Sequence, residues 1–147
     1  MRTLLNTAHA YMIVGLGAGL FYREITKAKH FTGQSQLGVV HTHVLALGML
    51  FFLIVLALEK LFTLTAHRLF RWFFGFYNLG LVLTVAVMTI HGTLTVLGKS
   101  SGEAIALGAG IGHVLLTVGL ILFFVMLGKI LSTHETARPI AAFAEHA

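Results

Sequence analysis

The sequence predicts an all-α fold, an integral membrane four-helix bundle that includes the whole chain, residues 1–147, as one domain. Hydrophobic residues make up 57% of the chain and charged residues only 10%. A soluble domain carries about 25% charged residues, so this chain has too little polar surface to cover a globule in water. Four long apolar runs provide the helices, and the alternating pattern of a membrane β-barrel is absent.

The four predicted spans are joined by short connections. A helix needs about 20 apolar residues to cross the hydrocarbon layer of a bilayer. Runs of this length cover residues 4–24, 37–58, 70–97 and 104–131. The first run lacks a convincing cleavage site, so we expect a retained span rather than a signal peptide. Residues 132–147 form a polar tail that we expect in water or at the membrane interface.

Small residues predict where these helices touch. The chain has 16 glycines, and glycine lets membrane helices approach closely. Two groups predict small-residue helix faces: Gly15, Gly17 and Gly19 in the first span, and Gly108, Gly110 and Gly112 in the fourth.

The basic residues predict the orientation of the spans. Four spans place both termini on one side, which carries Arg2, Lys60, Arg68, Arg71, Lys129 and Arg138. The other side carries Arg23, Lys27, Lys29 and Lys99. The positive-inside rule therefore places both termini in the cytoplasm. The net charge of +5 is scattered over the connections, which argues against nucleic-acid binding.

Histidines are the candidate metal ligands. The chain has 9 histidines and no cysteine, so thiolate sites and covalent c-type haem are excluded. Four lie in the half of the spans away from the termini, at expected depths of about 6 to 14 Å: His41, His43, His91 and His113. His9 falls near the opposite side. A single intramembrane histidine can simply bond to a neighbouring helix, but four such costly residues at similar depth predict a metal centre.

The spacing of His41 and His43 indicates the kind of centre. Successive helix residues turn by about 100°, so these two imidazoles point about 200° apart and cannot bind the same ion. A copper or zinc site needs three or four converging ligands. A b-type haem needs one or two axial histidines and a slot of small and apolar residues. The pair therefore favours two haem clefts, or one cleft repeated by symmetry.

The segment HTHVLALGMLFF, residues 41–52, resembles the tenth transmembrane helix of the large catalytic subunit of haem–copper oxidases. The resemblance implies a fold like one four-helix unit of that subunit. It also implies that His41 binds one haem and His43 a second haem on the other flank. A similar pattern occurs in NnrS-like membrane proteins and in small bacterial four-span proteins, which this chain resembles in length.

Departures from the oxidase pattern change the expected activity. The chain has no adjacent histidine pair for copper and no His-x-x-x-Tyr, so we do not expect a stand-alone oxygen reductase. Three copies would rebuild the twelve-span oxidase arrangement as a homotrimer. A bis-His haem b would then join His41 of one copy to His43 of the next. The alternative pairs His41 or His43 with His91 or His113 inside one chain.

Two basic residues are candidate partners of the haem propionates. Arg23 and Lys99 lie at the ends of their spans, next to the expected haem depth. Ordinary anchoring at the interface explains them equally well.

The expected function is electron transfer with a redox partner, or redox or gas sensing, by a non-covalent haem b. An alternative is a copper or proton transporter or channel built on the histidine layer. A structural accessory subunit is a third possibility, in which the histidines affect stability alone.

Overall fold

The structure, a computed structural model, describes the backbone of residues 1–100 and 102–144 and the side chains of residues 1–100 and 102–133. Within these residues the fold is all helical, and four helices are long and apolar enough to cross a membrane. The prediction of an all-α four-helix membrane protein is confirmed. The elements in chain order are α1 (Arg2–Ala28), α2 (Leu37–His43), the π-helix η1 (Val44–Leu50), α3 (Phe51–Phe62), the 3₁₀ turn η2 (Leu64–Ala66), α4 (Leu69–Val96) and α5 (Glu103–Ala144).

The elements α2, η1 and α3 form one continuous second span, Leu37–Phe62. The predicted spans agree with the helices within a few residues, except that α5 continues to Ala144 instead of ending at 131. Hydropathy marks where a helix leaves the membrane and not where it ends. The sequence after residue 131 contains no glycine that would stop the helix.

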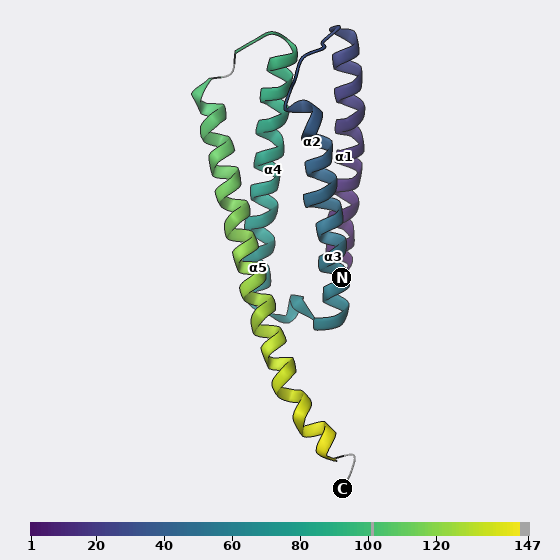
Figure 1. Cartoon of the computed structure of the whole chain (residues 1–147), viewed down its shortest axis with the longest axis vertical. Coiled ribbons are helices and arrows are strands. Elements are labelled where there is room, and N and C mark those ends of the chain that lie inside the picture. Colours follow the sequence, from purple (N-terminus) through teal and green to yellow (C-terminus); the bar gives the residue numbers. More distant parts are fainter. Residues whose placement is uncertain (101, 145–147) are drawn as a thin grey trace.

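The helices are arranged so that α4 lies between α5 and the second span, and α1 packs on the second span (Figure 1). The start of α1, the α3–α4 connection and the end of α5 lie at one end, which we call the terminal end (Figure 1). The connections 29–36 and 97–102 lie at the opposite end, which we call the loop end (Figure 1). Both ends of the chain therefore lie on the same side of the bundle.

Glycine allows α4 and α5 to lie very close together. A Cβ atom on Gly80 would lie 2.5 Å from the backbone nitrogen of Leu116, and one on Gly112 would lie 2.5 Å from Oγ1 of Thr84. No side chain fits at either position without moving a helix. These contacts fix the distance between the two helices.

The predicted glycine faces are correct only in part. Gly15 packs against Leu45, and Gly108 packs against Val87. A Cβ on Gly17 or on Gly110 would have no atom within 4 Å. Both glycines lie two residues from a packed one, and residues two apart in a helix point about 200° apart. They therefore face away from the contact.

The core is uneven along the bundle. Stacked and edge-on aromatic rings fill the half towards the terminal end, with Phe51 and Tyr77 at a centroid distance of 4.4 Å. The half towards the loop end has a smaller buried cluster of Leu37, Val40, Val44 and Val96. The loop end is therefore the less densely filled half.

A π-helix begins directly after His43. The hydroxyl of Tyr77 in α4 donates a hydrogen bond of 2.9 Å to the carbonyl of Leu47, inside η1. This extra donor stabilises a stretch in which the ordinary i to i−4 bonding is interrupted. Insertions of this kind are frequent at functional sites. Nothing in the hydrophobic pattern predicted it.

Candidate functional site

The first candidate ligand is His43, at the end of α2. Its Nδ1 lies 2.8 Å from the carbonyl oxygen of Val39, one turn earlier. Because a carbonyl can only accept, Nδ1 must carry the proton and donate it. The lone pair of the neutral ring then lies on Nε2, on the side of the ring away from the backbone. This is the arrangement found in most histidines that bind a metal.

His113 in α5 is held in the same way. Its Nδ1 lies 2.8 Å from the carbonyl oxygen of Ala109, again one turn earlier. The side chain is exposed. His113 therefore also presents an unprotonated Nε2 away from its own helix, with the ring orientation fixed by the backbone.

The two histidines lie at similar heights along the bundle. Leu37 packs directly on Gly92, and Gly112 packs on Thr84. At 1.5 Å per residue, His43 lies about 9 Å below the level of Gly92, and His113 lies about 13 Å below it. The difference is less than one helical turn.

The direction of His113 follows from its position around α5. Gly112 faces α4, whereas Phe123 lies slightly further round the helix and contacts Phe51 of α3. His113 is turned about 100° from Gly112, in the same sense as Phe123. It therefore lies on the side of α5 that faces the second span.

His91 lies nearer the loop end than His43 and His113 do. It lines an open hollow of about 380 Å³ between the start of the second span and α4. Val39 lines this hollow too, and His43 lies one turn below Val39 on the same face of α2. The other lining residues are polar: Gln34, Ser35, Gln36 and Thr95. The hollow is therefore mostly polar, and it lies about one helical turn from His43.

His41 faces a different way from His43. It packs beside Gly19 of α1, whose Cβ would lie 3.7 Å from Cβ and Cγ of His41. Its Nδ1 is buried and has no hydrogen-bond partner among the described residues. The spacing of one residue thus separates the two side chains. His41 lies against α1, whereas His43 lies on the face of α2 that carries Val39.

The four candidate ligands His41, His43, His91 and His113 do not converge. Their heights span about 13 Å along the bundle. Among the described residues, no group of three or more histidine, aspartate or glutamate side chains could hold a metal ion. Within one chain the geometry therefore offers pairs of imidazoles. His9 lies apart from them, in a small pocket with Met12 and Met49.

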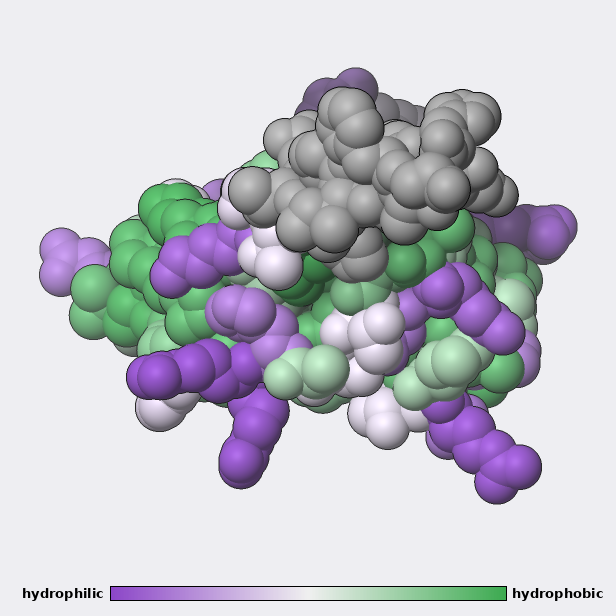
Figure 2. Space-filling model, turned by 90° about the horizontal axis from the view of Figure 1, so that it is seen from below, coloured by the Kyte–Doolittle hydropathy of each residue, from purple (hydrophilic) through white to green (hydrophobic). Residues whose placement is uncertain are grey.

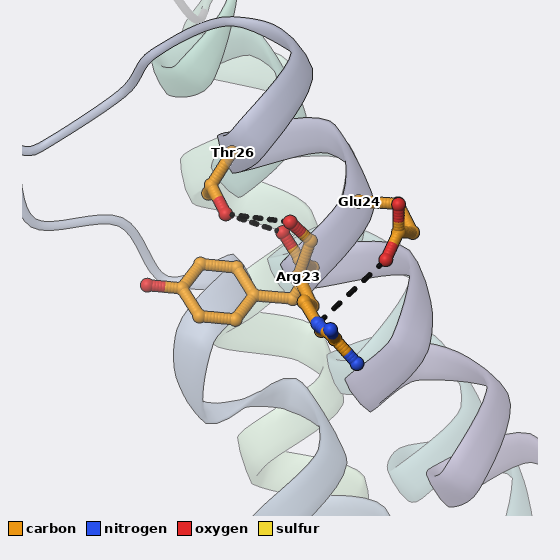
Figure 3. A network of polar contacts seen from close by, with 4 residues as sticks. Arg23, Glu24 and Thr26 are labelled. Carbon is orange, nitrogen blue, oxygen red and sulfur yellow. Dashed lines mark hydrogen bonds and ion pairs between the residues drawn. The ribbon is translucent and has the colours of Figure 1, made fainter.

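The two basic residues considered as partners of haem propionates, Arg23 and Lys99, lie on different parts of the bundle. Arg23 is exposed on α1, and its Nε lies 3.7 Å from Oε1 of Glu24 (Figure 3). The hydroxyl of Thr26 bonds nearby to the carbonyls of Tyr22 and Arg23 (Figure 3). Lys99 is exposed in the α4–α5 connection, at the loop end. Both basic residues therefore lie towards the loop end, Arg23 on α1 and Lys99 between α4 and α5.

Sequence reasoning missed the polar lining of the hollow. Gln34 and Gln36 flank Ser35, whose hydroxyl donates a hydrogen bond of 2.8 Å to the carbonyl of Gly92. This bond ties the start of the second span to α4. Three consecutive polar residues directly before an apolar run were the available signal.

Comparison with known proteins gives a family and no activity. Residues 1–130 match the family described as Protein of unknown function (DUF2871), and the chain belongs to it. No curated protein and no solved structure matches the chain.

Proposed function

We propose that this member of the DUF2871 family binds haem b non-covalently between α2 and α5, with His43 and His113 as axial ligands. The observation that carries the proposal is that both rings donate through Nδ1 to a carbonyl one turn earlier. Both Nε2 atoms are then free for iron, on helices that each pack against α4. The resemblance of residues 41–52 to an oxidase haem-binding helix supports it.

The residues near the two histidines fit the group. Ala109 and Val39 provide small and apolar surface beside the two histidines. Gln34, Gln36 and Lys99 provide uncharged and charged donors for propionates at the loop end. A haem held this way needs no cysteine, in agreement with the composition.

The protein's own residues would orient and tune the site. The hydrogen bonds that the two rings donate to the carbonyls of Val39 and Ala109 fix each imidazole and increase its basicity. A haem with two histidine ligands supplies one-electron chemistry and has no open position, which favours electron transfer over gas binding. Release of the exposed His113 would open a position and convert the site to gas sensing.

The oligomeric state belongs to the same proposal. A homotrimer, with haem b between His41 of one copy and His43 of the next, is the alternative ligation. In that arrangement His41 would have to reach past Gly19 at the α1–α2 contact. We place the protein in a bacterial inner membrane, as the resemblance to small bacterial four-span proteins implies. We place both termini in the cytoplasm, from the distribution of the basic residues.

Absorption spectra of the purified full-length protein, oxidised and reduced, test the proposal. We expect a Soret band and reduced bands of a six-coordinate b-type haem, unchanged by carbon monoxide in the wild type. His43→Ala and His113→Ala should each lose haem or become carbon monoxide-reactive. His91→Ala and His9→Ala are the matched controls and should keep the wild-type spectrum.

Two outcomes would replace this proposal. If His41→Ala rather than His113→Ala alters the spectrum, and the mass in detergent is that of three chains, the haem lies between copies. If no Soret band forms and metal analysis finds copper, the transporter or channel function is favoured instead. A purely structural role predicts no cofactor and histidine variants that change stability alone.

A further inference from the structure

The terminal end has two hollows that share His67. One, of about 350 Å³, lies between the α3–α4 connection and α5 and is lined by Lys129. The other, of about 620 Å³, lies beside the start of α4 and is lined by Arg68, Arg71 and Trp72. Both include Ala66 and His67. The haem proposal uses none of these residues.

The cations that line these hollows are not neutralised by the described part of the chain. Arg68, Arg71 and Lys129 are exposed and form no ion pair with any described residue. The one described carboxylate at this end, Glu59, is buried. Its two oxygens accept hydrogen bonds from the amide and the hydroxyl of Thr65, so it is occupied in holding the connection. The described side chains that line the hollows therefore carry a net positive charge.

His67 adds a directed hydrogen-bond donor. The amide of Leu69 donates a hydrogen bond of 3.1 Å to Nδ1 of His67. Because Nδ1 accepts, the ring proton lies on Nε2. His67 therefore presents an N–H group between the two hollows. In contrast, His43 and His113 each present a lone pair on Nε2.

The position of the hollows indicates the kind of anion. They lie where the second, third and fourth spans leave the apolar layer, and Trp72 at their rim is 63% exposed. Tryptophan at such a position lies at the level of the lipid headgroups. Hydrophilic side chains spread outward around this end of the bundle, beside hydrophobic surface (Figure 2). A ligand here meets charge and apolar surface together, as a phospholipid does.

We propose that the terminal end binds the phosphate of an anionic phospholipid, held by Arg68, Arg71, Lys129 and the Nε2–H of His67. The guanidinium groups bind phosphate oxygens in a bidentate manner. The acyl chains lie along the apolar surfaces of α4 and α5. Basic pockets between membrane helices are established sites for such headgroups.

The intrinsic fluorescence of Trp72 tests this directly, because it is the only tryptophan in the chain. The full-length protein is placed in bilayers that contain either brominated phosphatidylglycerol or brominated phosphatidylcholine at equal mole fraction. Each signal is divided by that of the unbrominated bilayer, which cancels quenching by any bound haem. We expect phosphatidylglycerol to quench more strongly at low mole fraction, with several-fold tighter relative binding.

Matched variants separate the site from general surface charge. R68Q/R71Q should lower the relative affinity for phosphatidylglycerol by about fivefold for each arginine. R2Q/K60Q removes two exposed cations at the same end but outside the hollows, and should leave the preference unchanged.

Three results would overturn the proposal. Equal quenching by both brominated lipids in the wild type would remove it without any variant. An equal loss in R2Q/K60Q would assign the preference to diffuse charge. Loss of the preference in millimolar inorganic phosphate would show that the ligand is a soluble anion rather than a lipid.

Discussion

The two ends of this bundle use histidine in opposite ways. Towards the loop end, His43 and His113 donate through Nδ1 to backbone carbonyls, which leaves Nε2 with a lone pair. At the terminal end, His67 accepts at Nδ1 from the amide of Leu69, which leaves Nε2 with a proton. The backbone partner of Nδ1 therefore decides whether a neutral imidazole can bind a metal or an anion through Nε2.

The two halves of the bundle also differ in how their cores are filled. The half towards the terminal end is filled by aromatic rings, so its hollows lie outside the core, on the surface. The other half has a smaller apolar cluster, and an open hollow lies there between the start of the second span and α4. Under the two proposals, a flat cofactor would lie in the second half and a lipid headgroup at the first.

The largest expected effect on stability comes from disrupting the contact between α4 and α5, which both ends of the bundle share. Gly80→Ala places a Cβ 2.5 Å from the backbone nitrogen of Leu116, so α4 and α5 must separate. We expect a loss of about 3 kcal/mol in the free energy of unfolding, measured by titration with a denaturing detergent. Gly110→Ala, which meets no atom within 4 Å, is the control and should not destabilise the protein. Equal effects of both would contradict the described helix contact.

The second prediction tests whether His113 and His67 have different roles. In His113→Met, the thioether can still bind iron, so we expect retained haem with a midpoint potential raised by about 100 mV. His67→Met should leave the potential unchanged, since its ring belongs to the other end. A potentiometric titration measures both. An unchanged potential in His113→Met would mean that His113 is not a ligand.

The third prediction concerns the support of the terminal end. Glu59→Ala removes a buried carboxylate that accepts two hydrogen bonds from Thr65. We expect a loss of about 2 kcal/mol in unfolding free energy and a weaker preference for anionic lipid at Trp72. Glu24→Ala removes an exposed partner of Arg23 at the loop end and should cost less than about 0.5 kcal/mol. A cost for Glu24→Ala as large as for Glu59→Ala would remove the distinction.

The smallest expected effect tests the π-helix between the two ends. Tyr77→Phe removes the hydroxyl that donates to the Leu47 carbonyl, and we expect a loss of about 1 kcal/mol with a shifted haem spectrum. Tyr22→Phe is the matched control, because the hydroxyl of Tyr22 donates to no described residue, and it should leave both quantities unchanged. If the spectrum of Tyr77→Phe stays that of the wild type, the π-helix does not position His43.

Much of this fold could be predicted because it depends on local properties of the chain. Composition and run length predict membrane helices, and the 100° turn per residue separates His41 from His43. The same geometry, applied to Gly17 and Gly110, explains why the predicted glycine faces were wrong in part. The relative heights of the four histidines could not be predicted from run length, because the contacts of Leu37 with Gly92 and of Gly112 with Thr84 set them.

The sequence by itself determined that the chain crosses a membrane, where its helices begin, and which residues could act as ligands. Those properties follow from the hydrophobicity and periodicity of each segment alone. Only the packing of the helices turns His113 towards the second span, gathers polar residues in a hollow with His91, and brings two hollows together at His67. Such relations depend on how helices rotate and shift against their neighbours, and contacts between distant residues set both.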